Sequence, residues 1–229
     1  MSDRHGISYN ALLRNYDRMN KKLKSHIQEF VFFAHKAAQH GLVRCGSGNL
    51  SCRIEQDIML ITSKGAWLSE LTEDAVMVCI INDDSPLEMK QPSIEIGMHR
   101  KILQKRKECN VVLHCQSPYA TAFACSANPQ RDIAVIPEIP FYIGKPALVP
   151  YFNPGSKELA AAVAEVIGNH ELVILQNHGQ IAVGKDFNET LQRAVYFEFA
   201  AEIVIKNGNS VTTLSKEAKE YLYSKGGTI

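Results

Sequence analysis

Apolar residues in the segment 23–40 recur at the spacing of an amphipathic helix, with Ile27, Phe30, Val31, Ala34 and Ala37 on one side. Gly41 follows this segment and is typical of the residue that ends a helix. Further helices are predicted over 157–167 and 188–206. The long helical segments therefore lie towards both ends of the chain.

Two shorter helices are predicted from the residues that start them. Pro92-Ser93 opens a helix that runs to about Gln104, with Ser93 as its N-cap. Glu95 then falls in the first turn, where the helix dipole favours negative charge. Ser117-Pro118 stops an apolar segment and starts the second helix.

Short apolar or alternating segments between the helices predict strands. These segments cover 50–54, 58–62, 75–81, 110–116, 172–175 and 180–183. Strands and helices are mixed rather than strictly alternating, so we expect an α/β fold. Its centre should be a largely antiparallel or mixed sheet with helices on its faces.

The composition fits one globular domain, because 229 residues with 45% hydrophobic residues can bury a large core. Lys plus Arg total 25 against 24 Asp plus Glu, which argues against nucleic-acid binding. We therefore interpret Lys21, Lys22 and Lys24 as a solvated helix face. No stretch approaches the ~20 apolar residues that span a bilayer, and the N-terminus lacks an apolar signal core. The sequence thus predicts a cytoplasmic protein without membrane contact, whose six cysteines are mostly small core residues.

Two histidine-containing segments could hold a metal ion. His114 and Gln116 lie two residues apart in a predicted strand, so their side chains should share one face. His178 stands between a strand end and Gly179, which permits a sharp turn into a cleft. Imidazole is a common ligand of divalent metals, and an amide oxygen is a weaker one. Each segment alone is more often a hydrogen-bonded core histidine or a polar turn.

Two further segments carry groups suited to a sugar phosphate. The loop around Gly46-Ser47-Gly48 exposes backbone N–H groups that can cradle a phosphate, helped by the Asn49 amide. The turn Ser63-Lys64-Gly65 is of the same kind and adds a cation. Glu95 could act as an acid/base, although a carboxylate at a helix start often serves only the helix.

Taken in order, these segments resemble the class II aldolase/adducin family, of which fuculose-phosphate aldolase is the best-known type. The resemblance covers roughly residues 25–205 of a single domain, 1–229, and implies a three-layer fold with a mostly antiparallel central sheet. The five motifs that carry it are Gly46-Ser47-Gly48-Asn49-Leu50-Ser51, Ile61-Thr62-Ser63-Lys64-Gly65, Pro92-Ser93-Ile94-Glu95, His114-Cys115-Gln116-Ser117-Pro118, and Asn177-His178-Gly179.

The resemblance also implies roles for individual residues. A divalent metal, in the family zinc, would be held at His114, Gln116 and His178. Glu95 would be the acid/base, and a tyrosine reaching a neighbouring subunit of a homotetramer would fall near Phe141 or Tyr142, of which we take Tyr142. The phosphate of a small phosphorylated sugar or sugar acid would bind at Gly48, Asn49, Lys64, Gly65 and Ser93.

Three departures from the family pattern change these expectations. Gln116 replaces a second histidine, which should weaken metal binding or shift preference towards harder ions. Ile94 replaces a serine that contacts phosphate. Lys64 stands where a small hydroxyl residue is usual, and its charge can compensate.

The resemblance implies a metal-dependent lyase, and three functions remain open. The first is retro-aldol cleavage of a phosphorylated ketose such as fuculose phosphate. The second is decarboxylation of a 3-oxo-tetronate phosphate, favoured by the segments 136–142 and 149–155, which resemble that branch. The third is a weakly active or non-catalytic adducin-like module, which Gln116 favours and the joint retention of His114, His178 and Glu95 opposes. Epimerases of the family tend to carry Asp at the position of Glu95, so epimerisation is disfavoured.

Overall fold

The computed structural model describes residues 9–82, 91–129 and 131–226, with only the backbone described for 9–20. A seven-stranded sheet forms its centre, in the order β3-β2-β1-β4-β7-β6-β5. Neighbouring strands are antiparallel except β5 and β6, which are parallel. The prediction of a mostly antiparallel central sheet is therefore confirmed. The strands are β1 (Asn49–Glu55), β2 (Ile58–Thr62), β3 (Val76–Ile80), β4 (Val111–Cys115), β5 (Ala147–Val149), β6 (Leu172–Leu175) and β7 (Gly179–Gly184).

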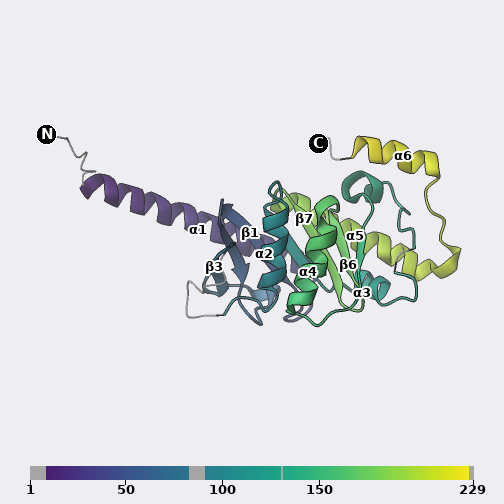
Figure 1. The fold of residues 1–229 in the computed structure, drawn as a ribbon, viewed down its shortest axis with the longest axis horizontal. Coiled ribbons are helices and arrows are strands. Elements are labelled where there is room, and N and C mark those ends of the chain that lie inside the picture. The colour runs from purple at the N-terminus through teal and green to yellow at the C-terminus, as the bar shows by residue number, and fades with distance from the viewer. Residues whose placement is uncertain (1–8, 83–90, 130, 227–229) are drawn as a thin grey trace.

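Helices cover both faces of the sheet, which gives the three-layer arrangement seen in Figure 1. Helices α2 (Ile96–Lys105) and α4 (Lys157–Val166) pack on one face. Helices α1 (Tyr9–Gln39), α3 (Pro118–Ala124) and α5 (Phe187–Asn207) pack on the other, and α6 (Lys216–Lys225) follows near the C-terminus.

Alternation along the strands divides the core into two clusters. In β4, Leu113 belongs to the cluster under α1, α3 and α5, whereas Val112 belongs to the cluster under α2 and α4. Because strand side chains alternate between faces, His114 shares the α2/α4 face with Val112. The same rule places Asn49 and Ser51 of β1 on that face, since Leu50 lies in the opposite cluster.

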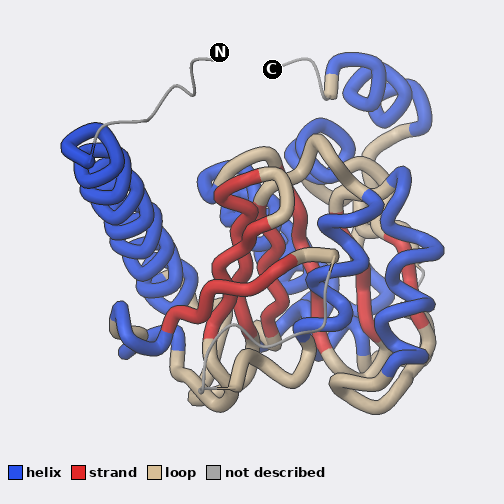
Figure 2. Tube along the Cα trace, turned by 60° about the vertical axis from the view of Figure 1, so that its left-hand side comes forward, coloured by secondary structure: helices blue, strands red, loops and turns tan. Residues whose placement is uncertain are grey.

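Most predicted elements are present, with differences at their ends. Helix α1 begins at Tyr9 rather than at residue 23, and its N-terminal part projects away from the sheet in Figures 1 and 2. The sequence did not predict β5, α6 or the short π-helix Ile139–Ile143. Lys21, Lys22 and Lys24 are exposed, which confirms the solvated helix face. None of the described helices is long and apolar enough to cross a bilayer.

Two boundary predictions were wrong at positions that matter for the site. Helix α2 begins at Ile96, so Glu95 is its N-cap residue and not part of the first turn, and Ser93 is not the cap. Strand β4 ends at Cys115, so Gln116 is not part of it. Pairing stops there because β1 begins at Asn49 opposite His114 and the last β7 partner, Gln180, lies opposite Cys115.

Candidate metal centre and active site

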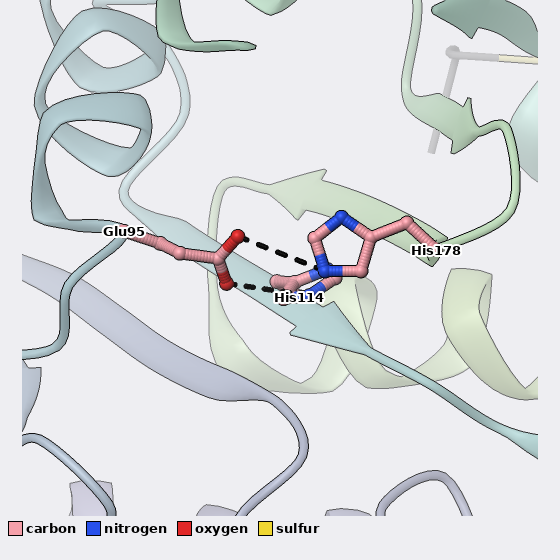
Figure 3. Close-up of side chains that lie close together, drawn as sticks. All are labelled: Glu95, His114 and His178. Atoms are coloured by element: carbon pink, nitrogen blue, oxygen red, sulfur yellow. Dashed lines mark ion pairs between the residues drawn. The ribbon is translucent and has the colours of Figure 1, made fainter. Parts of the chain in front are cut away.

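Three buried side chains converge at the ends of three separate elements. Glu95 stands at the start of α2, His114 in β4, and His178 in the turn between β6 and β7. Their ligand atoms all lie within 4.8 Å of one another. Figure 3 shows both carboxylate oxygens of Glu95 facing the two rings, with Oε2 3.4 Å from Nε2 of His114 and Oε1 3.8 Å from Nε2 of His178.

The orientation of His114 follows from its strand. Its Nδ1 lies 3.0 Å from the backbone carbonyl oxygen of Gln180 in the neighbouring strand β7. A carbonyl only accepts hydrogen bonds, so Nδ1 carries a proton, and in the neutral ring Nε2 is the nitrogen with the lone pair. A backbone hydrogen bond of this kind fixes the ring of a metal-binding histidine and its tautomer. His114 is therefore prepared to offer Nε2 to an ion.

The turn that carries His178 depends on the residues on either side of it. Asn177 has a positive φ of 54°, a conformation that asparagine tolerates better than most residues. A Cβ added to Gly179 would lie 2.5 Å from the carbonyl oxygen of Cys115, so only glycine lets this turn approach β4. Because of this close approach, the ring centroids of His178 and His114 lie 4.7 Å apart.

Burial and mutual contacts set the charges of the triad. Burial alone would raise the pKa of Glu95, but His114 and the hydrogen bond from Asn49 outweigh it and lower the pKa. Burial, and then the nearby His114, lower the pKa of His178 to about 4. At neutral pH the site thus offers a carboxylate and a neutral imidazole at His178.

These residues fit a divalent metal ion. Two imidazole nitrogens and a carboxylate are a donor set that zinc and other first-row ions accept. Oε1 of Glu95 is buried and has no hydrogen-bond partner among the described residues. A buried, unpaired carboxylate oxygen is costly unless something compensates it, and a cation would do so.

The three motifs expected to bind phosphate lie beside one another. A Cβ on Gly46 would lie 3.5 Å from the carbonyl oxygen of Gly65, which brings the two glycine-containing turns together. The backbone N–H of Ser93 donates to the carbonyl oxygen of Thr62 at 2.9 Å, which ties the third motif to the second. Gly48 and Gly65 have φ of +110° and +73°, and Lys64 is exposed. The five expected phosphate-site residues, Gly48, Asn49, Lys64, Gly65 and Ser93, therefore come from two turns, the start of β1 and the segment before α2, which meet.

The comparisons with known proteins identify the family. The model of the "Class II Aldolase and Adducin N-terminal domain" matches residues 28–205. The chain belongs to the class II aldolase and adducin family.

Members with different activities are similar to this chain. The 3-oxo-tetronate 4-phosphate decarboxylase of Haemophilus influenzae is 27% identical over 82% of this chain and 91% of its own length. An L-fuculose phosphate aldolase of Methanococcus maripaludis is 33% identical over 77% of this chain and 94% of its own. Among solved structures, YgbL of Klebsiella pneumoniae aligns with a TM-score of 0.81 at 25% identity, covering 87% of this chain and 98% of that one.

Gln116 and Tyr142, the two other site residues expected from the family, have different surroundings in this chain. Gln116 is half-buried just beyond β4, and its Cα would lie 3.3 Å from a Cβ on Gly179, next to the turn of His178. Tyr142 is half-buried and packs against the core of the opposite face, where its ring stacks on Tyr196 with centroids 5.4 Å apart and Arg193 donates to its carbonyl oxygen.

One assigned residue has contacts that differ from the family expectation, and two neighbours were missed. Asn49 is buried, and its side-chain amide N–H donates to Oε2 of Glu95 at 2.8 Å. Behind it lie His99 and Ser51, which the sequence analysis did not single out. The available signal was their spacing, since His99 is one helical turn after Glu95 and Ser51 shares the strand face of Asn49.

Proposed function

We propose that this chain is a metal-dependent aldehyde-lyase that cleaves a phosphorylated ketose such as L-fuculose phosphate by a retro-aldol reaction. The observation that carries this proposal is the convergence of Glu95, His114 and His178 on one point. It also speaks against a non-catalytic module, because such a module has no need of an unpaired buried carboxylate oxygen between two imidazoles.

The residues divide the work as follows. His114 and His178, with Gln116 beside them, would hold a divalent cation, most readily zinc. When bound, that cation stabilises negative charge on the substrate oxygen next to the breaking bond. Glu95 offers Oε1 for proton transfer at the adjacent carbon, because Oε2 already accepts from Asn49. Lys64 and the backbone of the glycine-containing turns would bind the phosphate.

Decarboxylation of a 3-oxo-tetronate phosphate is the second candidate. The similarity to the Haemophilus influenzae decarboxylase extends over most of both chains and supports it. Loss of carbon dioxide also leaves an electron pair on the carbon next to the carbonyl, and Glu95 could take a proton from water and pass it to that carbon. The same side chains would therefore serve either reaction.

We further propose that the active form is a homotetramer in which Tyr142 acts near the metal centre of a neighbouring subunit. In its own chain, Tyr142 is half-buried and packs against the core on the face opposite the triad. In the addition direction an aromatic hydroxyl from a neighbouring subunit could give its proton to the aldehyde oxygen, and in cleavage the phenolate would take that proton back as the aldehyde forms. Light scattering should find a tetramer, and Tyr142→Phe should lower turnover without changing the assembly; a stable monomer with full activity would contradict this.

The test compares two substrates on the purified, zinc-supplemented chain. Aldehyde release from L-fuculose 1-phosphate would support the aldolase, and carbon dioxide release from 3-oxo-tetronate 4-phosphate would support the decarboxylase. Glu95→Gln should lower whichever activity is found by roughly 100-fold or more. Turnover of neither substrate, with zinc bound, would reject both assignments.

A further inference from the structure

A chain of four buried polar side chains runs from the sheet into the triad. Oγ of Ser51 lies 2.7 Å from Nδ1 of His99. Nε2 of His99 lies 2.5 Å from Oδ1 of Asn49, and Nδ2 of Asn49 lies 2.8 Å from Oε2 of Glu95. The exposed fractions are 0% for Ser51 and His99, 6% for Asn49 and 5% for Glu95.

The ionised carboxylate decides the direction of every hydrogen bond in this chain. A carboxylate only accepts, so Asn49 must turn its amide N–H towards Glu95 and its carbonyl oxygen towards His99. His99 must then carry its proton on Nε2. Its Nδ1 is left as an acceptor, and Ser51 donates to it. All three donors therefore point towards Oε2 of Glu95.

Two short-range rules of protein geometry build this arrangement. Asn49 and Ser51 stand at i and i+2 of β1, on the face covered by α2. Glu95 caps α2, and His99 follows one turn later on the same side of the helix. The network is thus a contact between one strand face and one helix face, fixed on rigid elements and not on loops.

We propose that His99 is a positioning residue, which together with Ser51 holds the Asn49 amide in one orientation so that Glu95 is fixed through Oε2 and works through Oε1. The proposal rests on the proposed function of Glu95. Without the imidazole, the Asn49 amide can rotate and present its carbonyl oxygen to the carboxylate, which repels it. Glu95 would then lose both its hydrogen-bond donor and its fixed direction.

The tautomer of His99 tests the network independently of activity. Long-range ¹H–¹⁵N NMR on histidine-labelled protein should find His99 protonated on Nε2 alone at neutral pH, with its signals assigned by their loss in His99→Gln. Protonation on Nδ1 would reverse the donors and overturn the proposal, whether or not either sugar substrate is turned over.

Kinetics of matched variants test the positioning role. His99→Leu should lower kcat by about 10- to 100-fold, the usual cost of losing a residue that supports a ligand or catalytic group, with KM nearly unchanged. His99→Gln keeps a donor near the position of Nε2 and should recover most of the loss. His35→Leu removes an imidazole that bonds the Leu71 carbonyl outside the site and should leave kcat unchanged.

A double variant separates this role from a purely structural one. If His99 acts through Asn49, His99→Leu should lower kcat no further in an Asn49→Ala background, because the group it orients is gone. Additive losses would overturn the proposal, as would a loss in kcat that only follows a lowered Tm. Inactivity of the wild-type chain on both substrates would instead count against the proposed function, and the NMR result would still decide the network.

Discussion

The imidazole ring of His178 meets that of His114 edge to face, with centroids 4.7 Å apart and planes at 71°. His114 lies near the end of β4, and His178 lies in the turn between β6 and β7. The Nε2 atoms of both rings approach the carboxylate of Glu95. Two neutral rings in this arrangement can both coordinate one ion through a ring nitrogen, whereas two protonated rings at this distance would repel each other.

His114→Ala and His178→Ala should each abolish tight zinc binding. Losing a direct ligand should cost at least the ~10- to 100-fold in affinity that follows loss of a supporting residue. Isothermal titration with Zn²⁺ on protein treated with a chelator measures this. His40→Ala removes an exposed histidine and serves as the control. Unchanged affinity in both triad variants would exclude a metal at this position.

Gln116→His should raise metal affinity, because imidazole is a better donor to zinc than a neutral amide. The half-buried position of Gln116 beside the His178 turn leaves it near the triad. The same titration, with Gln116→Ala as the matched variant, decides its role. If neither change alters affinity, Gln116 is no ligand and Glu95 completes the set with the two histidines.

Glu95→Gln should keep the fold and lower kcat by roughly 100-fold or more, the scale of general acid–base catalysis. The amide keeps the shape of the side chain but cannot take up a proton. Glu158→Gln, on the exposed side of α4, is the control and should leave turnover unchanged. Full activity of Glu95→Gln on the true substrate would remove this residue from the mechanism.

The free energy of unfolding should fall as pH drops below about 6.5. Burial lowers the pKa of His99 to about 3 from the usual 6.5, so the unfolded chain binds a proton in this range and the folded chain does not. Stability therefore decreases with falling pH until pH approaches 3. Urea unfolding at pH 7 and pH 5 should show a smaller drop in His99→Leu than in wild type; an equal drop would contradict the assignment.

Two of the six cysteines should react quickly with a thiol reagent. Cys45 and Cys125 are exposed, and the other four are buried. Burial also raises the pKa of Cys52 to about 12 and that of Cys109 to about 11, which suppresses their thiolate forms. Ellman's reagent should count two fast thiols per chain, and none in Cys45→Ser/Cys125→Ser. Four further thiols should appear on unfolding.

The elements that the sequence predicts well have strong internal patterns. The range of β2, 58–62, was predicted to the residue, because the apolar run 58–61 and Thr62 form one short segment that is largely buried. The strand β5 was missed because Ala147–Val149 is only three residues long and lies between two prolines. This short apolar segment is a strand only because it pairs with β6. Long-range pairing of this kind leaves little trace in local sequence.

The candidate site shows the same division. His114, His178 and Glu95 were found because each stands in a motif, and the fold then brought them together. The cap position of Glu95 could not be foreseen, since it depends on the hydrogen bond between the backbones of Ser93 and Thr62. His99 was missed because a single histidine in an apolar helix face looks like any core residue until its partner across the interface is known.

Gly179 has a consequence for how this centre can change. Its missing side chain lets the turn of His178 touch the carbonyl of Cys115, so the spacing of the two imidazoles is set by the strand register. A larger residue there would have to push β7 away from β4, and with it every pair in that ladder. The loops proposed to bind the substrate phosphate are not bound by this constraint. Changes in the loops can therefore alter substrate specificity while the geometry of the triad stays the same. One fold can in this way support several carbon–carbon lyases.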